Sequence, residues 1–180
     1  LVQDLLAYSR VTGQPDSYVA VDTNQLVRTV LAQFHDDINA KQALVQTEPL
    51  PHIWGDAALL RQLFQNLISN ALKFVRPAVS PTIQIGGRAV TEPADPNAPG
   101  ISLPGTYVEV TVSDNGIGFD EKYLDRIFTI FQRLHGRNQY TGTGIGLAIC
   151  KKISDVHGGA ITARSRLGHG TTFTVYLPAA

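Results

Sequence analysis

The sequence predicts an α+β two-layer sandwich, in which helices pack on one face of a mixed β-sheet. Three observations indicate this fold class. The chain has 180 residues, 43% of them hydrophobic, which is enough for one domain with its own core. Apolar residues recur at helical spacing in three long segments, and short alternating segments between them fit strands. Some of these strands lie close enough in sequence to pair as hairpins, which makes part of the sheet antiparallel.

The charge balance excludes several classes of partner. With 15 Lys plus Arg against 15 Asp plus Glu, the formal net charge is zero, so we expect no nucleic-acid binding and no membrane contact. The apolar runs are far shorter than the ~20 residues that a membrane helix needs. The single Cys150 cannot pair within the chain and favours a reducing compartment, so we expect a cytoplasmic location.

The N-terminal segment is expected to be the end of a longer helix. Four apolar residues lie on one helical stripe: Leu1, Val2, Leu5 and Leu6. The pattern ends after Arg10, which is too short for a free-standing helix. We therefore interpret residues 1–12 as a helix tail whose apolar stripe needs a partner. The Gly- and Pro-containing cluster at 13–17 then marks a domain boundary.

The first half of the expected domain alternates short strands with amphipathic helices. Its elements are, in chain order, a strand at 18–21, a helix from Asp22 or Thr23 to Ile38, strands at 42–48 and 52–54, and a helix from Asp56 to Phe74. The helices are predicted because apolar residues recur every three or four positions, and because an Asp or Thr at the start can accept a hydrogen bond from a free backbone N–H. Pro49 and Pro51 bound the two middle strands.

The second half is richer in strands. Its elements are strands at 82–90 and 107–113, a helix from Gly146 to His157, and strands at 160–165 and 171–177. Alternation places Val108, Val110 and Val112 on the inner face of one strand. The segment 91–106 contains four prolines, and a loop of that length and composition is expected to be an exposed, mobile insertion.

Common catalytic signatures are missing from the sequence. There is no Gly-Lys pair and therefore no Walker A phosphate loop. The run Gly142–Leu147 resembles a dinucleotide fingerprint only superficially, because no strand leads directly into it. The five histidines never fall at i, i+4 spacing and have no CxxC companion, which argues against a metal centre, and no GxSxG motif indicates a serine hydrolase.

The first of four candidate clusters is a polar stripe on the helix expected at 56–74. Its members are spaced by four, four and three residues: Gln62, Asn66, Asn70 and Lys73. Asparagine is unfavourable inside a helix, so two on one stripe need an explanation. An Asn carbonyl oxygen is a suitable ligand for Mg²⁺, and a Lys one turn further can neutralise phosphates bound to the same ion. A solvent-exposed helix face is the alternative interpretation.

The second cluster is Asp114-Asn115-Gly116-Ile117-Gly118, which directly follows the strand expected at 107–113. A carboxylate fixed at the end of a strand accepts hydrogen bonds and can read an exocyclic amine such as that of adenine. The glycines let a ligand approach the backbone closely. An ordinary Asn-Gly turn is the alternative interpretation.

Two glycine-rich runs complete the set. The run Gly142–Gly146 enters the helix expected at 146–157, where free N–H groups and the helix dipole favour phosphate. The run Gly168–Phe173 is a tight turn into the last strand. Taken alone, the first could be a hinge before a helix and the second an ordinary hairpin. The order of all four clusters along the chain is what makes them informative.

In that order the clusters resemble the N, G1, F, G2 and G3 boxes of the catalytic ATP-binding domain of sensor histidine kinases, which has the Bergerat fold of the GHKL proteins. The matching segments are Asn66–Phe74, Asp114–Gly118, Phe128–Phe131, Gly142–Gly146 and Gly168–Gly170. The resemblance extends over essentially residues 18–178. Residues 5–10 resemble the end of the second helix of that family's dimerisation and phosphoacceptor hairpin, and this run and residues 144–153 are most similar to phytochrome-type kinases.

The resemblance implies roles for individual residues. Asn70 matches the Mg²⁺-ligating asparagine, and Asn66 matches the second asparagine of the N box. Asp114 matches the aspartate that reads adenine. The other ATP-binding positions are implied to be Lys73 beside the phosphates, Arg133 at the γ-phosphate, Gly116 and Gly118 on the adenine side, Gly142, Gly144 and Gly146 at the phosphates, and Thr171 near the aspartate. Lys73 and Arg133 would be the catalytic pair.

A lid over the nucleotide is implied between residues 119 and 143. Phe128 and Phe131 would anchor its start to the core, although ordinary core packing explains both residues equally well.

The implied reaction is transfer of the γ-phosphoryl group of ATP to a histidine on the dimerisation hairpin, followed by relay to an aspartate of a response-regulator receiver domain. Residues 1–12 would end the dimerisation helix, residues 18–180 would form the catalytic domain, and the parent protein would be a homodimer. None of the five histidines is followed by the acidic residue, Arg and Pro pattern of the family. The acceptor histidine is therefore expected outside this chain.

Three alternatives stay open. The same fold, as the resemblance implies, also serves GHKL ATPases, which hydrolyse ATP with a glutamate on the N-box helix. Asn66 stands at that position, and an amide cannot accept a proton from water, which favours phosphoryl transfer. An anti-sigma-type serine kinase is disfavoured by the helix at 1–12, and a non-catalytic kinase-like docking module is disfavoured by the intact motifs.

Overall fold

The computed structural model describes residues 1–13, 17–91, 105–134, 140 and 142–180. Its elements are α1 (Val2–Arg10), β1 (Val19–Val21), α2 (Thr23–Gln33), α3 (His35–Ala40), β2 (Leu44–Thr47), β3 (Ile53–Gly55), α4 (Ala57–Lys73), β4 (Thr82–Val90), β5 (Tyr107–Asp114), the short 3₁₀ helix η2 (Glu121–Tyr123), α5 (Leu124–Ile127), α6 (Gly146–Val156), β6 (Ala160–Arg166) and β7 (Gly170–Pro178). The expected strands and the helices expected at 56–74 and 146–157 are present, with boundaries within one or two residues in most cases.

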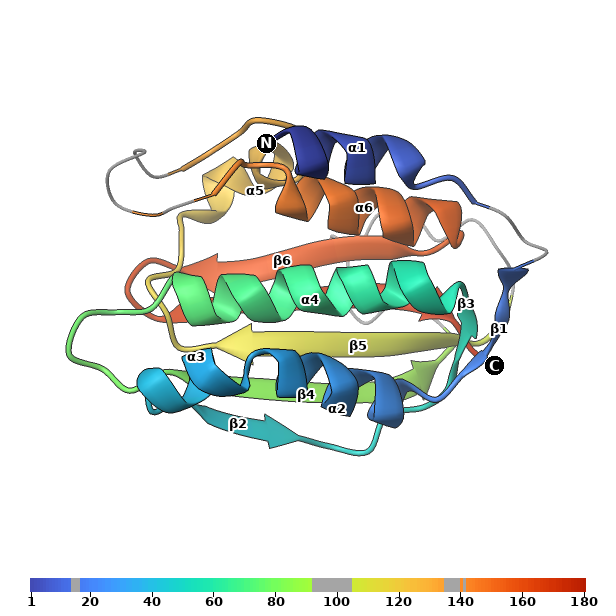
Figure 1. Ribbon diagram of the computed structural model, residues 1–180, viewed down its shortest axis with the longest axis horizontal. Helices are drawn as coiled ribbons and strands as arrows, with labels where there is room; N and C mark the ends of the chain where they lie inside the picture. Colours follow the sequence, from blue (N-terminus) through green and yellow to red (C-terminus); the bar gives the residue numbers. More distant parts are fainter. Residues whose placement is uncertain (14–16, 92–104, 135–139, 141) are drawn as a thin grey trace.

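A mixed five-stranded sheet forms one layer of the molecule, and helices form the other (Figure 1). The strand order is β2-β4-β5-β7-β6; β2 and β4 pair in parallel, whereas the other neighbours are antiparallel. Strands β1 and β3 make a separate two-stranded ribbon at one end of the sheet. The predicted α+β two-layer sandwich is therefore confirmed.

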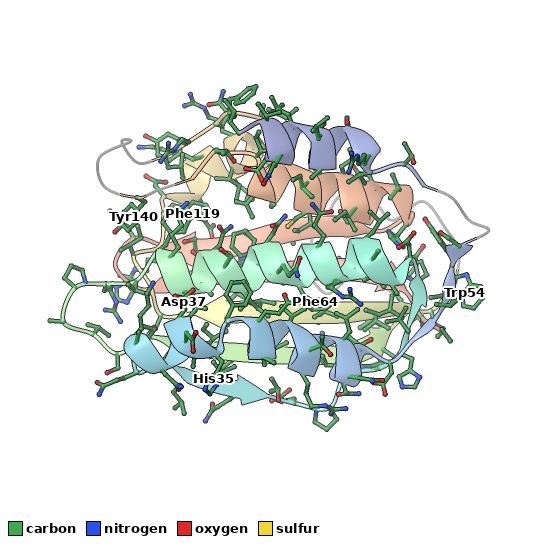
Figure 2. All side chains as sticks on the ribbon, in the orientation of Figure 1. His35, Asp37, Trp54, Phe64, Phe119 and Tyr140 are labelled. Carbon is green, nitrogen blue, oxygen red and sulfur yellow. The ribbon has the colours of Figure 1, made fainter. Side chains whose placement is uncertain are left out.

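Helix α4 lies across the centre of the sheet because its sequence gives it a capped start and a continuous apolar face. The Asp56 carboxylate accepts hydrogen bonds from the N–H groups of Ala58 and Leu59, which fixes the N-terminus. Five side chains of this face are at most 1% exposed: Leu60, Leu63, Phe64, Leu67 and Ile68. Phe64, labelled in Figure 2, belongs to this buried row. Truncating such a side chain to alanine costs about 2 to 5 kcal/mol of stability.

The helix expected from 22 to 38 is interrupted, so that prediction was wrong in one respect. Asp22 caps its start, accepting a hydrogen bond from Gln25 N–H. At Phe34 the backbone leaves the helical region (φ −98°, ψ 12°), which ends α2 and starts α3. The apolar spacing continues through Phe34 and Ile38, so periodicity alone does not reveal the break. Both side chains still pack against the core.

Helices α6 and α1 lie side by side at one edge of the helical layer (Figure 1). The inner face of α6 buries Ile149 and Ile153 completely or nearly so. The face of α1 that touches the domain carries Tyr8 and Ala7, and Val11 follows it at 1% exposed. The expected stripe of Leu1, Val2, Leu5 and Leu6 is instead exposed by 38 to 70%.

Three sequence expectations fall wholly or partly outside the described residues. They are the breaker cluster at 13–17, the proline-rich segment at 91–106 and the middle of the lid between 119 and 143. Within the described ranges, every helix is too short or too polar to cross a lipid bilayer.

Candidate functional site

A cavity of about 310 Å³ opens at the end of the molecule where β5 and α4 finish and where α6 and β7 begin. Phe119 and Tyr140 lie at this end of the molecule (Figure 2). Ten of the residues singled out from the sequence line it: Asn66, Asn70, Lys73, Asp114, Gly118, Arg133, Gly142, Gly144, Gly146 and Thr171. The four clusters are therefore brought together. Gly116 alone among the candidates is not part of the lining.

Asp114 is the half-buried carboxylate at the last position of β5. Burial raises its pKa to about 6, although the backbone N–H groups of Gly116 and Thr171 favour the charged form and limit the rise. Gly116 N–H donates to Asp114 Oδ1 at 2.8 Å. This carboxylate is oriented by its own turn, so its free oxygen lone pairs can accept a hydrogen bond inside the cavity.

Thr171 is held opposite Asp114 by the pairing of β5 with β7. Its hydroxyl, 7% exposed as a residue, forms a 2.8 Å hydrogen bond with Ser165 Oγ. Ser165 Oγ also accepts the N–H of Phe119 at 2.8 Å. Ser165 therefore ties the start of the lid to the β6–β7 hairpin. Sequence reasoning missed Ser165 because its partners are distant in sequence and no motif contains it.

The two glycines after Asp114 are required by close backbone contacts. A Cβ on Gly116 would lie 2.0 Å from the carbonyl oxygen of Phe74. Gly118 adopts φ +62°, and a Cβ there would lie 2.1 Å from the carbonyl oxygen of Arg166. Gly116 consequently acts on the cavity indirectly, by packing the turn against the end of α4 and by orienting Asp114.

The two asparagines of α4 make different contacts. Asn66 Nδ2 donates to the carbonyl oxygen of Gly146 at 3.2 Å, which joins α4 to the start of α6. The Asn70 side chain lines the cavity and has no hydrogen bond to any other described residue. Among the described residues, no three His, Cys, Asp or Glu side chains gather as a metal cage. A metal ion bound at Asn70 would therefore have few protein ligands among the described residues, and most of its ligands would come from elsewhere.

Two cations converge on the same end of the cavity. Burial lowers the pKa of Lys73, and the positive charge of Arg133 lowers it further. Gly142 has φ +147°, and a Cβ there would lie 2.2 Å from Lys73 Nζ. Neither cation forms a salt bridge with a carboxylate within the described part of the chain. Such a pair provides an anion-binding site.

One of the two expected lid anchors packs into the core, and the other does not. Phe128 lies edge-on to Phe173, with ring centroids 6.4 Å apart. Phe131 is 56% exposed and adopts φ +62°, so the expectation that it anchors the lid was wrong. Its N–H donates to the carbonyl oxygen of Gly144 at 3.1 Å, a contact between segments 13 residues apart in the sequence. An apolar residue type does not reveal such a backbone conformation.

Sequence reasoning also missed Tyr140 and Asp4, which line the cavity. The Tyr140 ring packs against Phe74 with centroids 5.1 Å apart, and its carbonyl oxygen accepts a hydrogen bond from Arg133. Asp4 reaches the cavity from α1, and its carboxylate accepts a 2.7 Å hydrogen bond from the hydroxyl of Thr143. Tyr140 could have been suspected because it lies two residues before the glycine run.

Residues 55–180 match the family of histidine kinase-, DNA gyrase B- and HSP90-like ATPases, and the chain belongs to this family. The resemblance drawn from the sequence boxes is thereby confirmed.

Two of the most similar relatives are a cyanobacterial phytochrome and a phytochrome-like protein. The chain is 40% identical over 178 residues to cyanobacterial phytochrome A of Nostoc sp., which covers 99% of the chain and 21% of the relative. It is 38% identical over 178 residues to the phytochrome-like protein Cph1 of Synechocystis sp., again covering 99% of the chain and 22% of the relative. The chain thus spans about a fifth of the length of these curated relatives.

Solved structures agree with the fold. Full-length ShkA, crystallised in complex with AMPPNP, superposes with a TM-score of 0.76 at 28% identity, over 99% of this chain and 35% of ShkA. The catalytic domain of histidine kinase ThkA superposes with a TM-score of 0.68 at 25% identity, over 90% of this chain and 95% of that domain.

Proposed function

We propose that the chain is the ATP-binding catalytic domain of a two-component sensor histidine kinase. Asp114 would accept a hydrogen bond from the adenine amine, and Lys73 and Arg133 would neutralise the phosphates. The backbone of the run from Gly142 to Gly146 would contact the phosphates at the start of α6. The observation that carries the proposal is the convergence of a half-buried carboxylate and two unbridged cations on one cavity.

The same cavity suits a magnesium ion bound together with the nucleotide. Mg²⁺ prefers one or two protein oxygens and takes its other ligands from phosphate and water. Asn70 offers one amide oxygen that no described residue engages, and this donor set fits such an ion. When bound, the metal neutralises charge on the phosphate oxygens. Asn70 would hold it, while Lys73 and Arg133 would orient the terminal phosphate.

Phosphoryl transfer is favoured over hydrolysis because position 66 carries an amide and not a carboxylate. Hydrolysis needs a group that accepts a proton from water, and an amide has no such capacity. The Asn66 amide is in addition engaged with the Gly146 carbonyl oxygen. The chain's contribution to transfer would then be positioning and charge neutralisation, which account for most of catalysis in this reaction class.

The proposed reaction needs partners outside this chain. Residues 1–12 would be the end of a dimerisation and phosphoacceptor hairpin, and residues 18–180 would be the catalytic domain. The γ-phosphoryl group would pass to a histidine of that hairpin and then to an aspartate of a response-regulator receiver domain, in a parent protein that is a homodimer and acts in the cytoplasm. The exposed leucine-rich stripe of α1 supports such a partner, because its side chains are 38 to 70% exposed.

Incubation with γ-labelled ATP and Mg²⁺ tests the proposal. The chain alone should bind ATP, release phosphate very slowly and remain unlabelled. Adding the missing hairpin as a separate polypeptide should give acid-labile label on the hairpin. Transfer should be weak, because the tether that provides a high effective concentration is absent.

Other outcomes point to the alternatives. Rapid phosphate release would favour an ATPase, and acid-stable label on a serine of an added partner would favour a serine kinase. Absence of nucleotide binding would favour a docking module. Acid-labile label on the chain alone would mean that the acceptor histidine lies within it.

A further inference from the structure

Helix α1 presents two opposite faces. The residues Asp4, Ala7, Tyr8 and Val11 follow the i, i+3, i+4, i+7 spacing of a single helical face and its continuation. This face packs on α6, where Lys152 Nζ donates to the carbonyl oxygen of Tyr8 at 2.8 Å and lies 4.4 Å from the centre of its ring. The exposed stripe that begins with Leu1 lies on the other side.

Of the residues on the α1 face that packs on α6, Asp4 is the one that lines the proposed nucleotide cavity. It is half-buried, it lines the cavity together with Lys73 and Arg133, and it accepts the hydrogen bond of Thr143 at 2.7 Å. Thr143 belongs to the glycine run at the start of α6. A negative charge on an otherwise peripheral helix is thus held in the lining of the cavity that also contains Lys73 and Arg133.

We propose that Asp4 is a positioning residue that couples the docking of α1 to the binding of the phosphates. This inference rests on the proposed function, because it requires the anionic ligand to be a nucleotide triphosphate. With α1 seated, the Asp4 carboxylate repels the phosphates and holds Thr143, so triphosphate binding is weakened. A change in the position of α1 that withdraws Asp4 removes this repulsion.

The coupling must act in both directions. If a seated α1 weakens triphosphate binding, then a bound triphosphate weakens the seating of α1 by the same factor. The effect should grow with the charge of the ligand, because it is electrostatic. It should therefore be largest for a metal-free triphosphate, smaller when Mg²⁺ neutralises part of the charge, and absent for adenosine.

The test compares Asp4→Asn with the wild-type chain by calorimetric titration. The asparagine keeps an oxygen that can accept the Thr143 hydrogen bond but removes the charge. AMPPNP without metal should bind roughly three- to tenfold more tightly, the size expected for one unit charge acting across a partly hydrated cavity. The gain should be smaller with Mg²⁺, and adenosine should bind both proteins equally. Asp37→Asn on α3, an exposed residue, changes the net charge equally and should leave all three affinities unchanged.

Hydrogen exchange supplies the reciprocal measurement. AMPPNP should accelerate exchange of the α1 amides in the wild type and much less in Asp4→Asn. Equal AMPPNP affinities of the two proteins would overturn the coupling, and weaker Mg-dependent binding by Asp4→Asn would assign Asp4 as a metal ligand instead. A wild-type chain that binds neither AMPPNP nor adenosine would contradict the proposed function itself, which is a different result.

Discussion

At the scale of single residues, Asp114 combines burial with a task that needs its charge. The carboxylate is half-buried, and its pKa lies near 6, yet only the ionised form has both oxygens available as acceptors. Asp114→Asn places an N–H₂ donor where the adenine amine needs an acceptor. We expect ATP affinity to fall by roughly fivefold to more than a hundredfold, since an unpaired buried group costs about 1 to 3 kcal/mol. Titration of the folded variant measures this loss, and an unchanged affinity would remove Asp114 from the site.

The raised pKa of Asp114 also predicts a pH dependence of binding. As the pH falls through about 6, the carboxyl group takes up a proton and loses acceptor capacity, so ATP affinity should decrease. The effect on stability has the opposite sign: this carboxyl group's contribution to stability is fully present below pH 4 and is lost as the pH rises through about 6. Titrations from pH 5 to 8 on the wild type and on Asp114→Asn isolate the effect. The same pH dependence in both proteins would assign it to the phosphates.

Asn70 gives a prediction about metal dependence. Asn70→Ala deletes the proposed magnesium ligand and leaves the adenine contacts intact. Affinity for ATP in the presence of Mg²⁺ should therefore fall by about tenfold, while affinity in the presence of a chelator should change little. Paired titrations with Mg²⁺ and with EDTA make the comparison within one variant. Equal losses in both conditions would assign Asn70 to the nucleotide rather than to the metal.

At the scale of elements, the sequence predicts those that carry their own start and stop signals. Helix α4 has a capping Asp56 and an unbroken apolar face, and it was predicted to within one residue. The break at Phe34 could not be predicted, because the apolar spacing continues across it while the backbone dihedrals change. The prediction for Phe131 fails for a related reason: its backbone adopts a positive φ, and its N–H bonds to Gly144, 13 residues away, neither of which the residue type reveals.

The end of α6 is joined to the start of α4 through His157. Its ring is stacked on Tyr18 at 4.8 Å, its Nδ1–H donates to the carbonyl oxygen of Ile153, and its Nε2 accepts the Asp56 N–H at 3.0 Å. These bonds require the neutral ring, and burial lowers the pKa of His157 despite the opposing charge of Asp56. Its contribution to stability is therefore present above pH 6.5 and is lost as the pH falls below that value.

We expect the free energy of unfolding to decrease below pH 6.5 by at most about 1.4 kcal/mol per pH unit for this one proton. Denaturant unfolding at several pH values measures the slope. His157→Gln should be less stable at pH 8 and should lose this part of the slope. The exposed His52 is the matched control, and His52→Gln should retain it. An unchanged slope in His157→Gln would contradict the assignment.

At the scale of the whole molecule, nucleotide binding should appear as thermal stabilisation. Ligand at a hundred times its dissociation constant adds about 2.7 kcal/mol, which raises Tm by roughly 5 to 10 °C for a domain of this size. Inosine triphosphate lacks the amine that Asp114 is proposed to read, so it should raise Tm much less at the same concentration. Equal shifts with both nucleotides would show that the base is not read at Asp114.

The assembly of the site was predictable only in part. The order of the boxes along the chain identified the lining residues from α4, β5 and α6, because each box carries an unusual local pattern. Asp4 and Ser165 were not predictable, because each depends on one contact with a distant residue in an otherwise ordinary segment. Asp4 and Thr143 are 139 residues apart, and the spacing of residues along the sequence does not indicate that they are in contact.

The pairing of β5 with β7 also determines where the chain can be extended. Thr171 pairs with Asp114 at the cavity, whereas Pro178 pairs with Tyr107, and seven residues of strand separate the two positions by about 23 Å. The last residue, Ala180, is fastened at that far end by its N–H bond to the carbonyl oxygen of His52. A fluorescent protein or a surface tether attached after Ala180 would leave the mouth of the cavity accessible, which makes this end the natural attachment point for an optical nucleotide sensor.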